Sequence, residues 1–326
     1  MNKFKYYFIL LITTLSLFSC SKDNDTADIT PPRDYAEQYA TDLKDIEEYL
    51  NNYYIEDVSA DADTKITKIP SGGTQPSLMS YLNKTTFPKL LSRELNFHNI
   101  TYKLYYLVLR EGVGLSPTNT DGVLTAYKGE YLSRTKVAEV QNLGATFFEE
   151  SKTPQQFFYL YNPNAPLIKG WEELFPQFKT GTYVSNADGT VTYSNFGAGV
   201  LFIPSGLAYY NAGSATIPAY APLVFSVKLY EINRVDSDGD GIMDFQEDLN
   251  GDGYMRLLPA GAINPDDTDG DGIPDFLDTD DDGDGVSTRK EVTDANGKLI
   301  PFDLIPSCDG NTTDPTRKKR HLVKCN

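Results

Sequence analysis

The chain has 326 residues, with 46 Asp and Glu against 29 Lys and Arg and a formal net charge of −17. So acidic a balance argues against a nucleic-acid partner, which needs a basic surface. Between Asp236 and Glu291 the chain has 18 acidic and three basic residues, so nearly all of the excess charge belongs to one segment. If a leader peptide at the N-terminus is removed, about 300 residues remain, which is enough for one medium-sized domain and an appendage.

The first twenty residues have the features of an export leader. Lys3 and Lys5 precede an apolar run over residues 6–18, which is too short to cross a bilayer as a mature helix. The run ends in Leu-Phe-Ser-Cys, which resembles a bacterial lipobox with Cys20 as the lipidated residue. The resemblance implies a signal peptide over 1–19 and a polar tether over 20–33, whose acidic start resembles that of surface lipoproteins in Bacteroidetes. We expect a lipid-anchored envelope protein at the outer membrane; a plain secretory signal with an incidental cysteine is the alternative.

Two more cysteines, Cys308 and Cys325, lie in the C-terminal tail over 293–326. In an exported protein, an even number of remaining cysteines predicts a disulfide. It would close a small terminal loop. Two free thiols are the alternative.

From residue 34 onward the pattern predicts a helix and then many strands. Apolar residues at helical spacing place a helix at the start of an N-terminal helical extension over 34–98. Strand-like segments follow at 101–109, 123–132, 155–161, 199–204 and 222–232, with one short helix near 170–181. Several strands around a short helix indicate an antiparallel α+β domain over 99–234.

Four segments of this domain resemble the FKBP family of peptidyl-prolyl cis-trans isomerases. They are TAYKGEYL, FFEES, LIKGWEELFPQFKTG and the stretch from IPSGLAYY to KLYEI. The resemblance implies a bent antiparallel sheet wrapped around a short helix, with an apolar cavity between them. Trp171, the single tryptophan, would form its floor; a core tryptophan in a domain without a cavity is the alternative. The implied site residues are Tyr127, Phe148, Glu149, Leu167, Ile168, Trp171, Tyr209, Ile217 and Phe225.

The resemblance implies isomerisation of X-Pro bonds, with no cofactor for catalysis. The partners would be proline-containing peptides or unfolded exported proteins, and the lipid anchor would bind the membrane. Three positions depart from the family pattern, namely Glu149, Gln156 and Tyr210. They favour an alternative in which the cavity binds proline peptides without turnover. A third interpretation is purely structural, with the C-terminal segment as a spacer.

The acidic segment over 235–292 contains loops with the spacing of EF-hand calcium loops. Oxygen ligands alternate along each loop, and a glycine occupies the sixth position. The candidate ligands are Asp236, Asp238, Asp240, Asp244, Glu247, Asp267, Asp269, Asp271, Asp275, Asp278, Asp280, Asp282, Asp284 and Glu291. The segment also resembles thrombospondin type 3 repeats, which implies calcium as a structural ion. A solvated acidic linker is the alternative.

Overall fold

The computed structural model describes residues 31–137, 139–259 and 261–325. The predicted signal peptide and Cys20 lie outside these residues. A compact unit begins at Asp34 and includes both the strand-rich domain and the acidic segment. None of the described helices is both long and apolar enough to span a membrane.

The main element is a seven-stranded sheet in which all the strand pairs are antiparallel. Its strands, in spatial order, are β3 (Lys89–Phe97), β4 (Ile100–Arg110), β10 (Gly197–Ile203), β11 (Leu223–Asn233), β5 (Gly122–Val137) and β6 (Val140–Ser151), with β7 (Phe158–Tyr159) paired to β5. The antiparallel sheet with few helices agrees with the α+β prediction.

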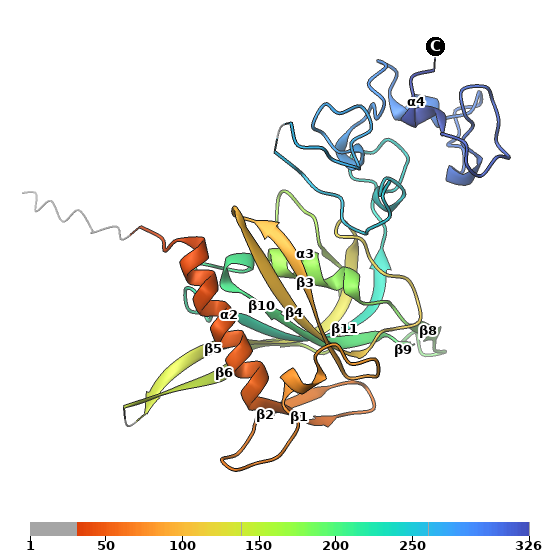
Figure 1. The fold of residues 1–326 in the computed structure, drawn as a ribbon. Coiled ribbons are helices and arrows are strands. Elements are labelled where there is room, and N and C mark those ends of the chain that lie inside the picture. The colour runs from red at the N-terminus through yellow and green to blue at the C-terminus, as the bar shows by residue number, and fades with distance from the viewer. Residues whose placement is uncertain (1–30, 138, 260, 326) are drawn as a thin grey trace, which may run out of the picture. The chain divides into compact units, whose positions relative to one another are not determined.

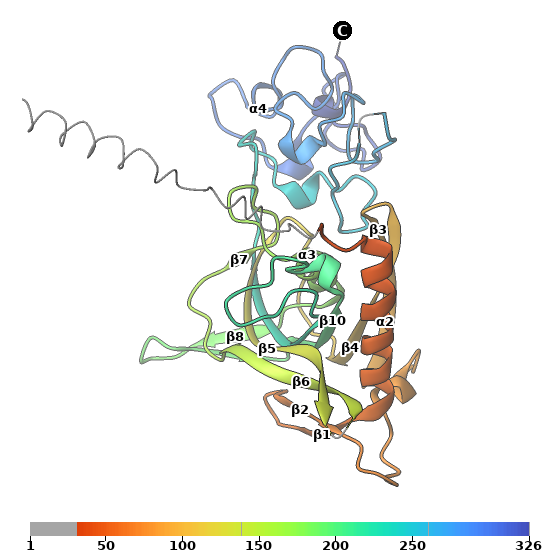
Figure 2. The ribbon, with the colours of Figure 1, turned by 90° about the vertical axis from the view of Figure 1, so that its left-hand side faces the viewer.

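Each face of this sheet packs against one helix (Figures 1 and 2). Side chains alternate along a strand, so Tyr106 of β4 contacts one core and Leu107 the other. The core on one face includes Trp171 and Leu174 of α3 (Lys169–Leu174). The core on the other face includes Ile46 of α2 (Tyr35–Asn52). The helix α2 therefore belongs to the domain instead of preceding it.

The predicted helical extension over 34–98 contains only one α-helix. After α2, which is N-capped by Asp34, come the hairpin β1 (Tyr53–Val58) and β2 (Thr64–Lys68), a turn of 3-10 helix η1 (Leu78–Tyr81), and β3. The strand β3 pairs along its whole length with β4, so the main sheet begins ten residues before the predicted boundary at 99. The turn between them uses His98 and Asn99, both with positive φ, as a tight hairpin requires.

Shorter elements complete the fold. A 3-10 turn η2 (Phe175–Gln177) extends α3, the insertion after it forms a hairpin of β8 (Thr182–Ser185) and β9 (Val191–Ser194), and η3 (Ser205–Leu207) follows β10. The C-terminal segment has only short helices: η4 (Asp244–Gln246), η5 (Asp275–Leu277), α4 (Thr288–Glu291), η6 (Phe302–Leu304) and η7 (Arg320–Leu322).

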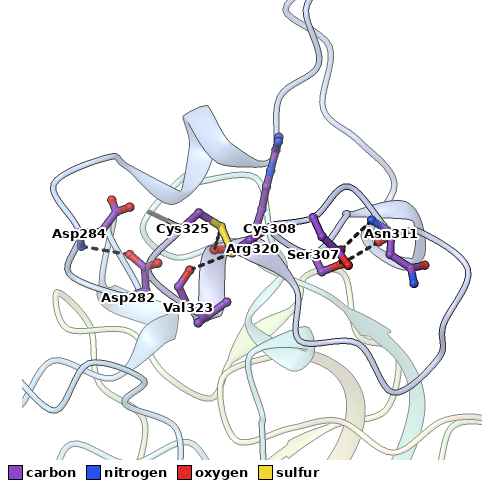
Figure 3. Close-up of a disulfide and its surroundings, with 9 residues drawn as sticks. Asp282, Asp284, Ser307, Cys308, Asn311, Arg320, Val323 and Cys325 are labelled. Carbon is purple, nitrogen blue, oxygen red and sulfur yellow. Dashed lines mark hydrogen bonds between the residues drawn. A yellow bond between two sulfur atoms is a disulfide. The ribbon is translucent and has the colours of Figure 1, made fainter.

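The C-terminal segment has its own small core. Ile242, Val292 and Ile305 are buried together, so the first acidic loop, the end of the last one and the tail pack as one body. A disulfide joins Cys308 to Cys325 beside the loop that carries Asp282 and Asp284 (Figure 3). Because this core contains residues from both sides of the predicted boundary at 292, the acidic loops and the tail form a single structural unit.

Candidate functional site

Aromatic rings surround Trp171 on α3. The centroids of Tyr127, Phe175 and Phe225 lie 5.2, 5.1 and 5.2 Å from the indole, all edge to face. Such pairs add stability beyond the burial of their area. The indole is only 5% exposed, and its Nε1 is buried without a hydrogen-bond partner among the described residues. Trp171 is thus buried within a cluster of aromatic rings, and its role as the floor of a cavity stays a prediction.

The rim of this site is made by β5 and β6. Phe148 packs edge to face on Phe225, with centroids 5.6 Å apart. The hydroxyl of Tyr127 donates to Glu149 Oε1 at 2.6 Å. Burial and then the Glu149 carboxylate raise the pKa of Tyr127. The longer side chain of Glu149, one of the three departures, still reaches the rim tyrosine.

A hollow of about 370 Å³ lies at the N-terminal end of α3, and Trp171 is not among the residues that line it. Leu167, Ile168 and Tyr209, three of the predicted site residues, line it together with Phe97 and His98 of the β3–β4 turn. Tyr209 is 40% exposed, and its hydroxyl has no hydrogen-bond partner in the described part of the chain. Burial and the charge of Glu149 raise its pKa, which keeps the phenol protonated as a donor. Ile217, the last of the nine residues, is buried in the same core.

The other two departures from the family pattern have structural explanations. Gln156 is exposed, and Phe158 supplies the ring expected there, 5.6 Å from Trp171 and 5.9 Å from Tyr127. Tyr210 has φ of +45°, a conformation that favours glycine. Its ring stacks on Tyr35 at 4.2 Å, and this packing holds the residue in place.

The helix α2 fixes the loop that carries Tyr209. Asp42 is 1% exposed and accepts hydrogen bonds from the amide and the hydroxyl of Ser205, at 2.7 and 2.6 Å. Gln38 donates to the same carboxylate and to the carbonyl of Tyr220. Burial raises the pKa of Asp42 to about 6, although these hydrogen bonds lower it. Sequence patterns missed this function of α2 because its partners are more than 160 residues away.

A buried ion cluster joins α3 to the acidic segment. Glu173 is fully buried and pairs with Arg93, Lys169 and Arg256, at 3.2, 3.3 and 2.9 Å. Burial alone would raise the pKa of Glu173, but the bonds and charge of Arg256 and the other cations lower it. The ring of Tyr254 lies 3.7 Å below the Arg93 guanidinium, and its hydroxyl donates to the Glu173 carbonyl. The acidic segment is therefore anchored two residues from Trp171.

The acidic loops share one hydrogen-bond pattern. In each of four loops, the amide of the glycine at position six donates to the carboxylate of the residue at position one, at 2.8 to 3.1 Å. Three sets of carboxylates each bring their oxygens within 4.8 Å of one another: Asp236, Asp238 and Asp240; Asp267, Asp269 and Asp271; and Asp280, Asp282 and Asp284. The acids that end the loops of the second and third sets differ: Asp278 accepts from the Asp280 amide, and Glu291 has one buried oxygen without a partner among the described residues.

Two predicted ligands have a different role. Asp244 accepts from the amide and the hydroxyl of Ser237, both at 2.8 Å. Asp275 accepts in the same way from Thr268, at 2.7 Å. Both carboxylates therefore help to close the loop, and their role as metal ligands stays a prediction.

Comparisons with known proteins agree with the geometry of the central domain. An FKBP-type peptidyl-prolyl cis-trans isomerase, FkpA of Aeromonas hydrophila, is 31% identical over 139 residues, which are 42% of this chain and 41% of that protein. A stretch of 139 residues of this chain is thus similar in sequence to an FKBP-type isomerase. The chain spans about two fifths of that relative's length.

Solved isomerase structures are also similar. A peptidyl-prolyl cis-trans isomerase from Pseudomonas syringae has 16% identity, with 63% of this chain and 100% of that chain covered and a TM-score of 0.33. FkpA from Escherichia coli has 29% identity, with 40% and 48% covered and a TM-score of 0.28. At such low TM-scores the relationship depends on the sequence match.

The C-terminal segment matches a different family. Residues 237–315 fit the model described as BamM C-terminal. The thrombospondin type 3 relationship expected from the sequence is therefore not supported. The matched range also crosses the predicted boundary at 292, in agreement with the small core shared by the loops and the tail.

Proposed function

We propose that this chain is a lipid-anchored envelope protein with peptidyl-prolyl cis-trans isomerase activity toward exported proteins. The observation that carries the proposal is the cluster of aromatic rings around Trp171, together with Tyr209, which lines a hollow at the N-terminal end of α3. The sequence similarity of 139 residues of the chain to an FKBP-type isomerase supports it.

The chemistry needs no nucleophile. Rotation about an X-Pro bond has a barrier of about 18–20 kcal/mol, because the carbonyl and the nitrogen share resonance. The twisted transition state loses that resonance and is less dipolar than the planar amide. An apolar ring-walled site therefore binds it better than the ground state, which is what accelerates a reaction. The Tyr209 hydroxyl would donate to the substrate carbonyl, and each tenfold in rate corresponds to about 1.4 kcal/mol.

A protease-coupled assay on an X-Pro peptide tests the proposal. We expect turnover by the full chain, a fall in Trp171→Ala, and a smaller fall in Tyr209→Phe that leaves peptide binding intact. Tyr183→Phe is the matched control, since Tyr183 is an exposed tyrosine on the β8–β9 hairpin. If wild-type protein binds the peptide but does not turn it over, the proline-binding module is the correct function. If wild-type protein neither binds the peptide nor turns it over, both the isomerase and the proline-binding function are excluded.

We also propose that calcium orders the acidic segment. The three carboxylate sets and the repeated position-one to position-six hydrogen bonds support this. Hard carboxylate oxygens at alternate positions suit calcium. Limited proteolysis with calcium and with chelator tests it: residues 236–291 should become cleavable in chelator while the sheet domain persists. A cleavage pattern unaffected by calcium would refute it.

A further inference from the structure

Three carboxylates from two distant acidic loops meet in the interior of the C-terminal segment. Asp240 and Glu247 belong to the first loop, over 236–247, and Asp281 to the last, over 280–291. The exposed fractions of the three residues are 2, 2 and 1%. One oxygen from each lies within 4.8 Å of the others. Asp281 is not part of the alternating loop pattern, in which positions one, three and five supply the ligands.

The oxygens of this cluster are not used by the protein. Both oxygens of Glu247, both of Asp281 and Oδ2 of Asp240 are buried without a hydrogen-bond partner among the described residues. Buried polar atoms are nearly always paired, and an unpaired buried carboxylate is strongly disfavoured. A cation would supply the missing partner.

The first and last loops have the acid and the hydroxyl residue exchanged between positions two and nine. This exchange leaves the carboxylate of Asp281 unused in closing its loop. In the first loop, the hydroxyl residue Ser237 at position two donates to the acid Asp244 at position nine. In the last loop the acid is at position two and the hydroxyl at position nine, where Thr288 Oγ accepts from the Asp281 amide at 3.0 Å. The loop is still closed by this bond, and one oxygen of the Asp281 carboxylate lies within 4.8 Å of oxygens of Asp240 and Glu247.

We propose that Asp240, Glu247 and Asp281 form a binding site for one hard divalent cation of the calcium type, which joins the first and last acidic loops. Three carboxylates without nitrogen or sulfur ligands select such an ion. Glu247 offers two free oxygens and can bind bidentately. Arg289 from the last loop, whose guanidinium donates to the Gly239 carbonyl, already holds the two loops together. The cation would complete this contact above the core of Ile242, Val292 and Ile305.

This site differs from the sites within single loops proposed above, and it does not depend on isomerase activity. The first loop's own set, Asp236, Asp238 and Asp240, shares Asp240 with it. A cation at the new site would therefore stabilise the first loop but not the middle loop. A substitution in the middle loop can thus serve as the control.

Calcium titration of the chelator-treated full chain by calorimetry tests the site. We expect Asp281→Asn to weaken the tightest class of calcium sites by about tenfold or more, and Glu247→Gln to do the same. Asp267→Asn, in the middle loop, should lose one weakly bound calcium ion and keep the tightly bound one. Near-ultraviolet circular dichroism checks that each variant is folded, and neutral amides of the same size should stabilise the calcium-free form.

The outcomes separate the two proposals. If wild type binds calcium and both Asp281→Asn and Glu247→Gln bind it with unchanged affinity, the joint site is refuted while the single-loop sites stand. If wild type binds no calcium, both proposals fail. If Asp281→Asn and Asp267→Asn weaken the binding of the same calcium ion equally, then Asp240, Glu247 and Asp281 do not form a separate site. That result also refutes the inference.

Discussion

Asp42 of α2 accepts two hydrogen bonds from Ser205, which lies 163 residues later in the loop that leads to Tyr209. A buried carboxylate with a backbone and a side-chain donor holds both parts in one geometry. The helix ahead of the predicted domain thus positions the loop with the proposed hydrogen-bond donor. A truncated domain that starts at residue 99 would lack this support.

The raised pKa of Asp42 predicts a pH-dependent stability. Its ordinary pKa is 3.8 and its folded pKa about 6, so between these values the unfolded state releases the proton first. The free energy of unfolding therefore falls as the pH rises through this window, by up to about 3 kcal/mol. Asp42→Asn lacks the titrating group, so its free energy of unfolding should not show this decrease. In urea denaturation, the difference in free energy of unfolding between variant and wild type should therefore change between pH 4 and pH 7. Parallel curves would contradict the prediction.

Gly129 is required by the ring of Phe148. A Cβ at this position would lie 2.4 Å from the end of that ring. We expect Gly129→Ala to displace Phe148, lower the free energy of unfolding by about 1–3 kcal/mol, and reduce X-Pro turnover. Gly144→Ala is the control, because a Cβ there meets nothing within 4 Å. Equal effects of the two substitutions on denaturation and turnover would show that the contact with Phe148 is unimportant.

Glu173 should be essential for docking the acidic segment. Glu173→Gln leaves Arg93, Lys169 and Arg256 without their shared carboxylate, and breaking a buried pair typically costs about 3–5 kcal/mol. The expected results are a lower stability in urea and faster proteolysis near Tyr254. Glu111→Gln serves for comparison, since the pair of Glu111 with Lys179 is about half exposed and should change stability by less than about 1 kcal/mol. Should Glu173→Gln behave like this surface variant, the cluster does not hold the segment.

The disulfide between Cys308 and Cys325 should stabilise the tail. Closing a loop of this size contributes about 3 kcal/mol by restricting the unfolded chain. Thermal unfolding of Cys308→Ser, Cys325→Ser and the double variant under oxidising conditions measures it. The double variant should lose no more stability than either single one, because all three remove the same bond. Additive losses would mean that each cysteine acts on its own.

The sequence predicted the parts of the fold that carry local patterns. The β-rich segments and the helix with Trp171 are contiguous stretches, so alternation and the family resemblance sufficed to find them. The strand β3 was missed because its hairpin with β4 turns through His98 and Asn99, without the glycine that marks such a turn. The contacts of Tyr210 with Tyr35, and of Asp281 with Glu247, join residues far apart in the chain, and no local pattern reports such contacts.

The ion cluster at Glu173 has a consequence for the order in which the protein matures. Arg93 and Lys169 precede Glu173 in the chain, but Arg256 is translated 83 residues after it. Until that arginine is in place, Glu173 lacks one of its three counter-charges, and the Tyr254 ring that stacks on Arg93 is also missing. The strand-rich domain thus reaches its final rigidity only once the acidic segment has been synthesised.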